Sequence, residues 1–219
     1  MTMAMKVTPK SAEKVISVLG KTYTKKGDMD LGSAKDTLLG VLLSARTTDV
    51  QVLKRFPAFR ERFPTWESLA EADVDEIGSY IHTIGLYKTK AKAIKGLAHK
   101  ILTEFGGNVP DTMEELITLP GVGRKTASCV LSYVFHTPAI AVDTHVFRIA
   151  RRLGWAKGNT PEKVEKELMA AVPQSSWNEI NRTFVQFGRD ICVGGKTPKC
   201  WACPVAKWCA YRPKTPKPT

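Results

Sequence analysis

Long apolar runs are absent from this sequence of 219 residues. No stretch approaches the roughly 18 consecutive apolar residues that a membrane-spanning helix needs, which excludes a membrane span. The first residues, MTMAMKVTPKSAEK, contain no apolar segment and no cleavage site typical of a secretory signal peptide. No segment alternates between apolar and polar residues for long enough to predict a β-strand. The sequence therefore predicts an intracellular, all-α protein.

Acidic residues are scarce relative to basic ones, since 21 Asp and Glu stand against 33 Lys and Arg, for a net charge of +12. No acid follows Asp190, whereas basic residues continue toward the end of the chain: Lys196, Lys199, Lys207, Arg212, Lys214 and Lys217. Such an excess favours a polyanionic partner, because binding releases the counterions of the polyanion. A merely soluble basic protein is the alternative, and charge alone does not decide between the two.

Cysteine is rare, and four of the five cysteines lie after Asp190: Cys192, Cys200, Cys203 and Cys209. Cytosolic proteins seldom form disulfides, so the pattern C-x7-C-x2-C-x5-C predicts a metal site. Four thiolates this close in sequence can converge on an iron–sulfur centre or on zinc. A structural zinc site usually has two separated C-x2-C pairs and this chain has one, yet spacing alone leaves both metals open. Cys129 lies among apolar residues and is predicted as plain core.

Helices are predicted along the chain from the periodicity of apolar residues and from capping signals. The segment 34–44 is apolar on most sides and is expected to be buried. Pro57 is expected to break the helix that starts at residue 50, and Gly188 to end the helix of residues 178–188. The lysines of the helix at 88–105, among them Lys90, are predicted to form a solvated face, with nucleic-acid contact as the alternative. Further helices are expected at 9–25, 74–81, 146–153 and 161–171, and another begins after Thr65.

Residues 114–145 read EELITLPGVGRKTASCVLSYVFHTPAIAVDTH, and the rest of the chain is expected to serve them. Two helical patterns, 114–119 and 125–135, flank the turn Pro120-Gly121-Val122-Gly123, which is too short for anything but a tight hairpin. Both glycines are free to take positive φ angles, and the second helix should begin with exposed backbone N–H groups. These groups, at the positive end of the helix dipole, suit a phosphate oxygen.

Lys125 and Asp143 are the candidate catalytic residues of this stretch. Lys125 falls in the first turn of the second helix, where the dipole disfavours the charged ammonium, and a neutral amine can attack a carbon electrophile. Asp143 follows the apolar run 140–142, so its carboxylate should be poorly solvated and in need of a partner such as Lys125. The alternative is an ordinary helix–helix turn with a solvated Lys125 and an Asp143 that caps the next helix. The residues alone leave both interpretations open.

The motif LPGVGRKTA, followed by VDTH, resembles the helix-hairpin-helix, Gly-Pro-Asp superfamily of DNA glycosylases, and within it the endonuclease III branch of bifunctional glycosylase/lyases. The similarity runs from about Leu38 to Cys209. It implies an all-α fold of two helical domains that flank a DNA-binding cleft. One domain, residues 27–137, is a six-helix barrel that ends in the hairpin at 119–125. The other joins residues 1–26 to residues 138–219 and carries an iron–sulfur cluster loop at 192–209.

The resemblance also implies roles for particular residues. Lys125 becomes the Schiff-base nucleophile and Asp143 the catalytic carboxylate. The expected DNA-binding residues are Gly121, Gly123 and Arg124 of the hairpin and the wedge residues Arg46 and Leu86. His145 is also expected to bind DNA, and its position two residues after Asp143 leaves two alternatives, orienting that site or capping a helix. The family often has glutamine where this chain has Arg46, so the preference for the opposite base is expected to differ.

The same resemblance implies that Cys192, Cys200, Cys203 and Cys209 hold a 4Fe–4S cluster with a structural role. The family usually has one residue fewer in the first gap, where this chain has seven. Gly194 and Gly195 lie in that gap and can absorb the extra residue.

The implied activity is removal of a damaged base, of the oxidised-pyrimidine class, through a lysine Schiff base, followed by β-elimination that nicks the abasic strand. The expected partner is double-stranded DNA with a damaged base or an abasic site. The protein is expected to be a monomer that acts in the cytoplasm, at the nucleoid. Two alternatives stand beside this one. The first is a mismatch-specific glycosylase, although those branches lack the lysine found at 125. The second is a non-catalytic DNA-binding protein with a hairpin and a metal site.

Overall fold

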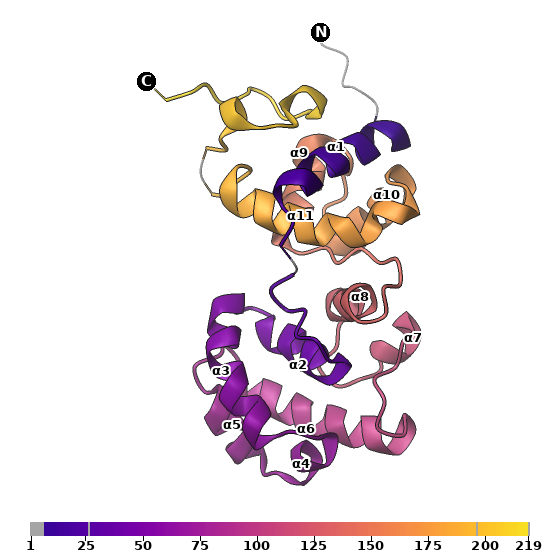
Figure 1. Ribbon diagram of the computed structural model, residues 1–219, viewed down its shortest axis with the longest axis vertical. Helices are drawn as coiled ribbons and strands as arrows, with labels where there is room; N and C mark the ends of the chain where they lie inside the picture. Colours follow the sequence, from indigo (N-terminus) through magenta and orange to yellow (C-terminus); the bar gives the residue numbers. More distant parts are fainter. Residues whose placement is uncertain (1–6, 26, 196, 219) are drawn as a thin grey trace. The chain divides into compact units, whose positions relative to one another are not determined.

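The computed structural model describes residues 7–25, 27–195 and 197–218, so Lys196 of the basic C-terminal segment lies outside the described residues. The chain divides into two compact units, one formed by Gly27–His136 and the other by Met1–Lys26 with Thr137–Thr219. Within the described ranges all regular structure is helical and no strand occurs, which confirms the all-α prediction (Figure 1). Across the same ranges no helix combines the length and the apolar character needed to cross a membrane.

The unit Gly27–His136 is organised around a buried helix. Its helices are α2 (Ala34–Ser44), α3 (Asp49–Arg62), α4 (Trp66–Glu71), α5 (Val74–Ile81), α6 (Tyr87–Glu104), α7 (Met113–Leu116) and α8 (Arg124–Tyr133). Every residue of α2 from Asp36 to Ser44 is buried, as the sequence predicted. Helix α2 packs against α3, α6 and α8, while α4 and α5 pack on α6 (Figure 1).

Helix α3 runs without interruption through Pro57, so the predicted break is wrong. Proline inside a helix removes one backbone hydrogen bond and costs about 3 kcal/mol. Phe56 and Phe59, on either side of it, are buried, and their rings contact each other in a tilted arrangement with a centroid distance of 5.9 Å. Burying two aromatic side chains contributes about 2–3 kcal/mol each, which offsets the cost. The proline itself is exposed.

The lysines of α6 do not all form a solvated face, because Lys90 is buried with 6% of its surface exposed. Lys88 and Lys92 are exposed, as predicted, and Lys95 and Lys100 are half-buried. The Lys90 ammonium donates to the backbone carbonyls of Leu43 and Ala45 at 2.8 and 2.7 Å. Burial lowers the pKa of Lys90 to about 8, so the ammonium form still predominates at neutral pH.

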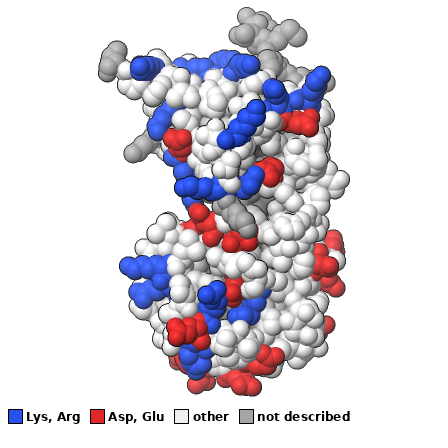
Figure 2. All heavy atoms as spheres, viewed as in Figure 1, with Lys and Arg blue, Asp and Glu red and all other residues white. Residues whose placement is uncertain are grey.

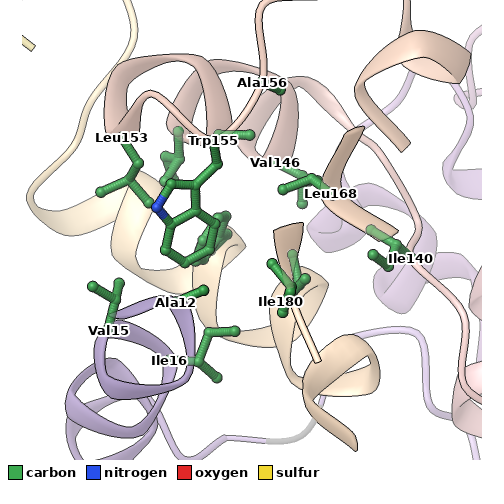
Figure 3. Close-up of a cluster of buried hydrophobic side chains, with 14 of the residues drawn as sticks. Ala12, Val15, Ile16, Ile140, Val146, Leu153, Trp155, Ala156, Leu168 and Ile180 are labelled. Carbon is green, nitrogen blue, oxygen red and sulfur yellow. The ribbon is translucent and has the colours of Figure 1, made fainter. Parts of the chain in front are cut away.

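The other unit packs α1 (Pro9–Thr22) against α11 (Trp177–Asp190), and α9 (Thr144–Leu153) against α10 (Pro161–Ala171) and α11. Three short 3-10 helices complete it: η1 (Gln174–Ser176), η2 (Cys200–Ala202) and η3 (Ala206–Trp208). Trp155 lies in its core between Leu153 and the α1 residues Ala12 and Val15 (Figure 3). The capping signals were reliable here, since Thr160 caps α10 and Pro161 occupies its first position.

Helix α11 extends to Asp190, so the prediction that Gly188 ends it is wrong. Gly188 is buried within the helix, where a larger residue would meet the side chains of α9. A Cβ atom at this position would lie 2.5 Å from His145 Nδ1 and 2.9 Å from Arg148 Nη2. Glycine at this position therefore leaves room for the His145 and Arg148 side chains of α9.

Candidate functional site

The hairpin between α7 and α8 contains a tight turn and two glycines, Gly121 and Gly123, which differ in backbone conformation. Val122 donates to the carbonyl of Leu119 at 3.0 Å, and both of these side chains are buried. Gly121 has φ +78, and a Cβ atom there would lie 2.9 Å from Ala93 Cβ. Gly123 has φ −94, so of the two glycines that are free to take positive φ angles Gly121 does so and Gly123 does not. It precedes α8 in extended backbone, which any residue can adopt.

Replacing each hairpin glycine by serine should separate these two roles. Gly121→Ser is expected to cost about 1–3 kcal/mol of stability, because the left-handed backbone and the contact with Ala93 both oppose a side chain. Gly123→Ser is expected to change stability by less than about 0.5 kcal/mol, because serine is a favoured N-cap residue. Thermal unfolding of the two variants measures the difference. Equal destabilisation would contradict the assignment.

Lys125 lies in the first turn of α8, where the sequence predicted it, and its side chain is exposed together with that of Arg124. The next six residues of α8, Thr126 to Leu131, are all buried. Cys129 is among them, which confirms that it is core. Gly123 provides no side-chain cap to the helix. The hairpin thus holds a lysine amine beside uncapped helical N–H groups on a rigidly packed helix.

Asp143 belongs to the other unit and is half-buried at the start of α9. Its Oδ1 atom accepts a hydrogen bond from Val146 N at 2.7 Å, so the capping role considered from the sequence is real. The apolar run before it is also held in place, because Asn181 donates to the Ala141 carbonyl at 3.0 Å. Capping employs one carboxylate oxygen, and it fixes the orientation of the whole group.

His145 lies on α9 and contacts Arg148, a residue to which the sequence pattern assigned no role. Arg148 Nη2 lies 3.1 Å from His145 Nδ1 and donates to the Gly188 carbonyl at 3.2 Å, and its Nε donates to the Cys192 carbonyl at 3.1 Å. Since the guanidinium can only donate, His145 Nδ1 is the acceptor and the ring proton is assigned to Nε2. Arg148 therefore ties α9 to α11 and to the cysteine loop.

The four C-terminal cysteines, Cys192, Cys200, Cys203 and Cys209, line one pocket with apolar side chains such as Ile149, Phe187 and Val205. In the described ranges no group of three or more His, Cys, Asp or Glu side chains forms a ready-made metal site, so the thiols share a pocket without converging on one point.

Two basic residues, Arg152 and Lys214, line this pocket. Arg152 Nη1 lies 3.3 Å from Cys192 Sγ and donates to the Val193 carbonyl at 2.8 Å. Burial raises the pKa of Cys192, and it raises the pKa of Cys203 to about 11. A metal centre must therefore displace thiol protons on binding, as thiolate ligation generally requires. Four soft thiols, an apolar pocket and a neighbouring guanidinium fit an anionic iron–sulfur cluster.

Arg46 and Leu86 lie in two loops of the unit Gly27–His136 and share an unusual backbone conformation. Their φ angles are +56 and +62, and positive values are uncommon outside glycine. Both side chains are exposed, Leu86 with 56% of its surface. The loops touch, because Gly85 N donates to Thr47 Oγ1 at 3.0 Å. Sequence patterns contain no signal for such a backbone at either residue.

Basic side chains also spread over the outer surface. On the face shown in Figure 2, Lys and Arg gather over the unit that contains α1 and α9–α11, whereas acidic and basic groups mix over the other unit. A positive surface of this kind attracts a polyanion.

Comparisons with known proteins agree with this geometry. Residues 39–174 match the HhH-GPD superfamily of base excision DNA repair proteins. The chain is 40% identical over 200 residues to Endonuclease III of Synechocystis sp., covering 90% of this chain and 91% of that protein. It is 37% identical over 187 residues to Endonuclease III of Escherichia coli, covering 85% and 88%.

Solved structures extend the comparison to three dimensions. A trapped Endonuclease III–DNA covalent intermediate superposes with a TM-score of 0.86 at 33% identity, covering 93% of this chain and 96% of that one. A thermostable thymine-DNA glycosylase has a TM-score of 0.80 at 25% identity, covering 92% and 96%. The helical fold, the glycine hairpin with its lysine and these similarities lead to one conclusion: the chain belongs to the HhH-GPD superfamily of base excision DNA repair proteins, and within it to the endonuclease III family.

Proposed function

We propose that the protein is a bifunctional DNA glycosylase and abasic-site lyase of base excision repair, acting as a monomer on double-stranded DNA that contains a damaged base or an abasic site. One observation carries the proposal. A lysine occupies the first turn of α8, directly after the glycine hairpin, in a chain that superposes on a trapped Endonuclease III–DNA covalent intermediate. We infer from a DNA substrate that the protein acts in the cytoplasm, at the nucleoid.

The hairpin supplies DNA binding and the nucleophile. Phosphate oxygens accept hydrogen bonds from the N–H groups at the start of α8, after Gly123, which have no side-chain cap. Gly121 lets the backbone approach the phosphate closely, and Arg124 adds a positive charge. The Lys125 amine attacks C1′ of the deoxyribose, the glycosidic bond breaks, and the base leaves with the bonding electron pair. Asp143 accepts a proton from the amine and stabilises positive charge on the sugar. The C1′–O4′ bond then breaks, O4′ takes up a proton, and the opened sugar is joined to Lys125 as an imine. Loss of a C2′ proton from this imine breaks the C3′–O bond to the 3′ phosphate, which leaves as an anion, and the strand is nicked.

A base inside a duplex must leave the stack before this chemistry, at a cost of a few kcal/mol. Arg46 and Leu86 fill the gap that it leaves, and His145 supports the DNA-binding surface from α9. Both wedge side chains are exposed on loops and available for insertion. Arginine at residue 46 has five N–H donors for the orphaned base and no acceptor, so the preferred opposite base should present acceptors such as the O6 and N7 atoms of guanine.

The unit Gly27–His136 serves as the barrel domain with the hairpin, and the other unit as the domain with the cluster. Cys192, Cys200, Cys203 and Cys209 hold a 4Fe–4S cluster, whose contribution is to cross-link the C-terminal loop. Gly195, with φ +64, lies in the longer first gap and turns the chain there. Arg152 donates toward Cys192 and offsets the negative charge of the ligand set.

The cluster assignment predicts a colour. Purified protein should be yellow-brown with absorbance near roughly 400 nm, as thiolate-bound iron–sulfur clusters are. Elemental analysis should find iron and sulfide, and Cys203→Ser should lose both. Colourless protein that contains zinc would reverse the assignment.

A panel of duplexes tests the activity itself. Separate substrates carry one oxidised pyrimidine, one abasic site or one thymine·guanine mismatch. The proposal expects base release and strand nicking on the first two. The mismatch substrate is included because the chain is also similar in structure to a thymine-DNA glycosylase. Release of mismatched thymine without nicking would favour the mismatch branch, and binding without release on any substrate would favour a non-catalytic DNA-binding protein.

A further inference from the structure

Lys90 holds the two loops that carry Arg46 and Leu86. It lies four residues after Leu86, in the first turn of α6, and its backbone N–H donates to the Leu86 carbonyl at 3.0 Å. Its ammonium reaches across to the end of α2, where it donates to the carbonyls of Leu43 and Ala45. Lys90 therefore contacts the backbone of Leu86 and the backbone of Ala45, the residue immediately before Arg46.

The contact with Ala45 bears directly on the conformation of Arg46. The Ala45 carbonyl belongs to the peptide group that joins the two residues, so its direction is set together with ψ of Ala45 and φ of Arg46. Ala45 has ψ 121 and Arg46 has φ +56. A left-handed conformation is unfavourable for a non-glycine residue, and a 2.7 Å hydrogen bond from a buried ammonium can offset that cost.

Leu86 is fixed by the same helix and by the same pair of loops. It is the N-cap residue of α6, with φ 62 and ψ 29, and its carbonyl receives the Lys90 N–H. Gly85 links it to the other loop by its 3.0 Å bond to Thr47 Oγ1. A Cβ atom at Gly85 would lie 3.3 Å from the Arg46 carbonyl oxygen, so the two loops are in van der Waals contact.

Burying a lysine is energetically unfavourable, because the ammonium loses its hydration. An apolar side chain would fill the same space at lower cost but would leave the Leu43 and Ala45 carbonyls without this donor. The helix end at α2 also attracts a positive charge, since C-terminal carbonyls carry the negative end of the dipole. The charge of Lys90 is thus matched to the loop backbone that it contacts.

We propose that Lys90 is a positioning residue that presets Arg46 and Leu86 as one wedge for entry into the DNA duplex. The inference rests on the proposed function, in which those two side chains fill the gap left by the extruded base. Lys90 touches neither substrate nor the reacting atoms. Its contribution should be needed only where a duplex has to be opened.

The test compares Lys90→Met with a matched control on the same helix. Lys95 is half-buried on α6 and also donates to a backbone carbonyl, that of Ala72 at 2.8 Å, away from the wedge loops. Single-turnover borohydride trapping is measured with an abasic site in a duplex and with the same strand alone. Lys90→Met should slow trapping on the duplex by about tenfold or more, as expected for a misplaced group, and change the single-strand rate by less than about twofold. Lys95→Met should leave the ratio of the two rates at the wild-type value.

Three results would overturn the inference. Lys90→Met could slow both substrates equally, which would make Lys90 an ordinary structural residue, or it could match wild type on both. If that variant fails to unfold cooperatively on heating, Thr47→Val replaces it, because it removes the other link between the loops. The third contradicting result would be a Thr47→Val variant whose ratio of duplex to single-strand trapping rates equals that of the wild type. Wild-type protein that traps neither substrate would instead overturn the proposed function, and this inference with it.

Discussion

Lys125→Gln is expected to abolish the covalent adduct between the protein and abasic-site DNA in the presence of borohydride. The adduct forms only when an amine has condensed with C1′ of the sugar and the imine is reduced, and glutamine has no nucleophilic amine. Loss of a nucleophile typically lowers turnover by about 10³-fold or more. Gel electrophoresis under denaturing conditions measures the adduct, and binding to uncleaved duplex measures whether the hairpin still functions.

The matched control is Lys92→Gln, which removes an exposed lysine from α6. It changes the net charge by the same amount but should leave adduct formation at the wild-type level. An adduct of undiminished yield with Lys125→Gln would show that another amine attacks the sugar. In that case the hairpin lysine would be a phosphate contact, and the non-catalytic interpretation of the hairpin would gain weight.

Asp143→Asn is expected to lose most turnover while DNA affinity and stability stay close to wild type. Asparagine can still accept the hydrogen bond from Val146 N, because Asn and Asp are equally favoured at helix N-caps. It cannot take a proton from the amine or place a negative charge beside the sugar. Removal of such a group lowers turnover by about 10²–10⁴-fold. Steady-state nicking and gel-shift affinity separate the two effects.

Asp143→Ala completes this comparison, because it removes the cap as well as the carboxylate. It should be as inactive as Asp143→Asn and, in addition, about 1 kcal/mol less stable. If Asp143→Asn nicked abasic DNA at the wild-type rate, the residue would be a helix cap only, and the proton acceptor would have to be sought elsewhere. The capping geometry alone is compatible with both roles, so the activity of the asparagine variant decides.

Helix positions followed from local signals wherever burial and capping agreed. The Thr160-Pro161 start of α10 and the buried α2 are correct because capping hydrogen bonds and an all-round apolar helix depend on residues within one or two turns. Pro57 and Gly188 were misjudged because each acts through distant contacts. The aromatic neighbours of Pro57 are buried in the unit core, and Gly188 makes room for side chains from α9.

For the candidate site, too, the sequence indicated some residues and the structure alone showed others. Residue type and local spacing mark Lys125 and Asp143 as candidates but leave their roles open. The resemblance to the DNA glycosylase superfamily is what assigns them as nucleophile and carboxylate. Their catalytic roles stay predictions until the variants are measured. The hydrogen bonds from Arg148 to the carbonyls of Gly188 and Cys192 join residues about 40 positions apart in the chain, and the periodicity of the sequence contains no signal for them.

By itself, the sequence determined that this protein is helical and basic, carries a glycine hairpin with a lysine beside it, and ends in four clustered cysteines. Those properties reside in composition and in spacings of a few residues. Only the tertiary structure decided that Lys90 is buried, that it holds the end of α2, and that Arg46 and Leu86 take left-handed backbone angles. The physical reason is distance along the chain: Lys90 and the Ala45 carbonyl are separated by 45 residues and meet only after α2 and α6 have packed together.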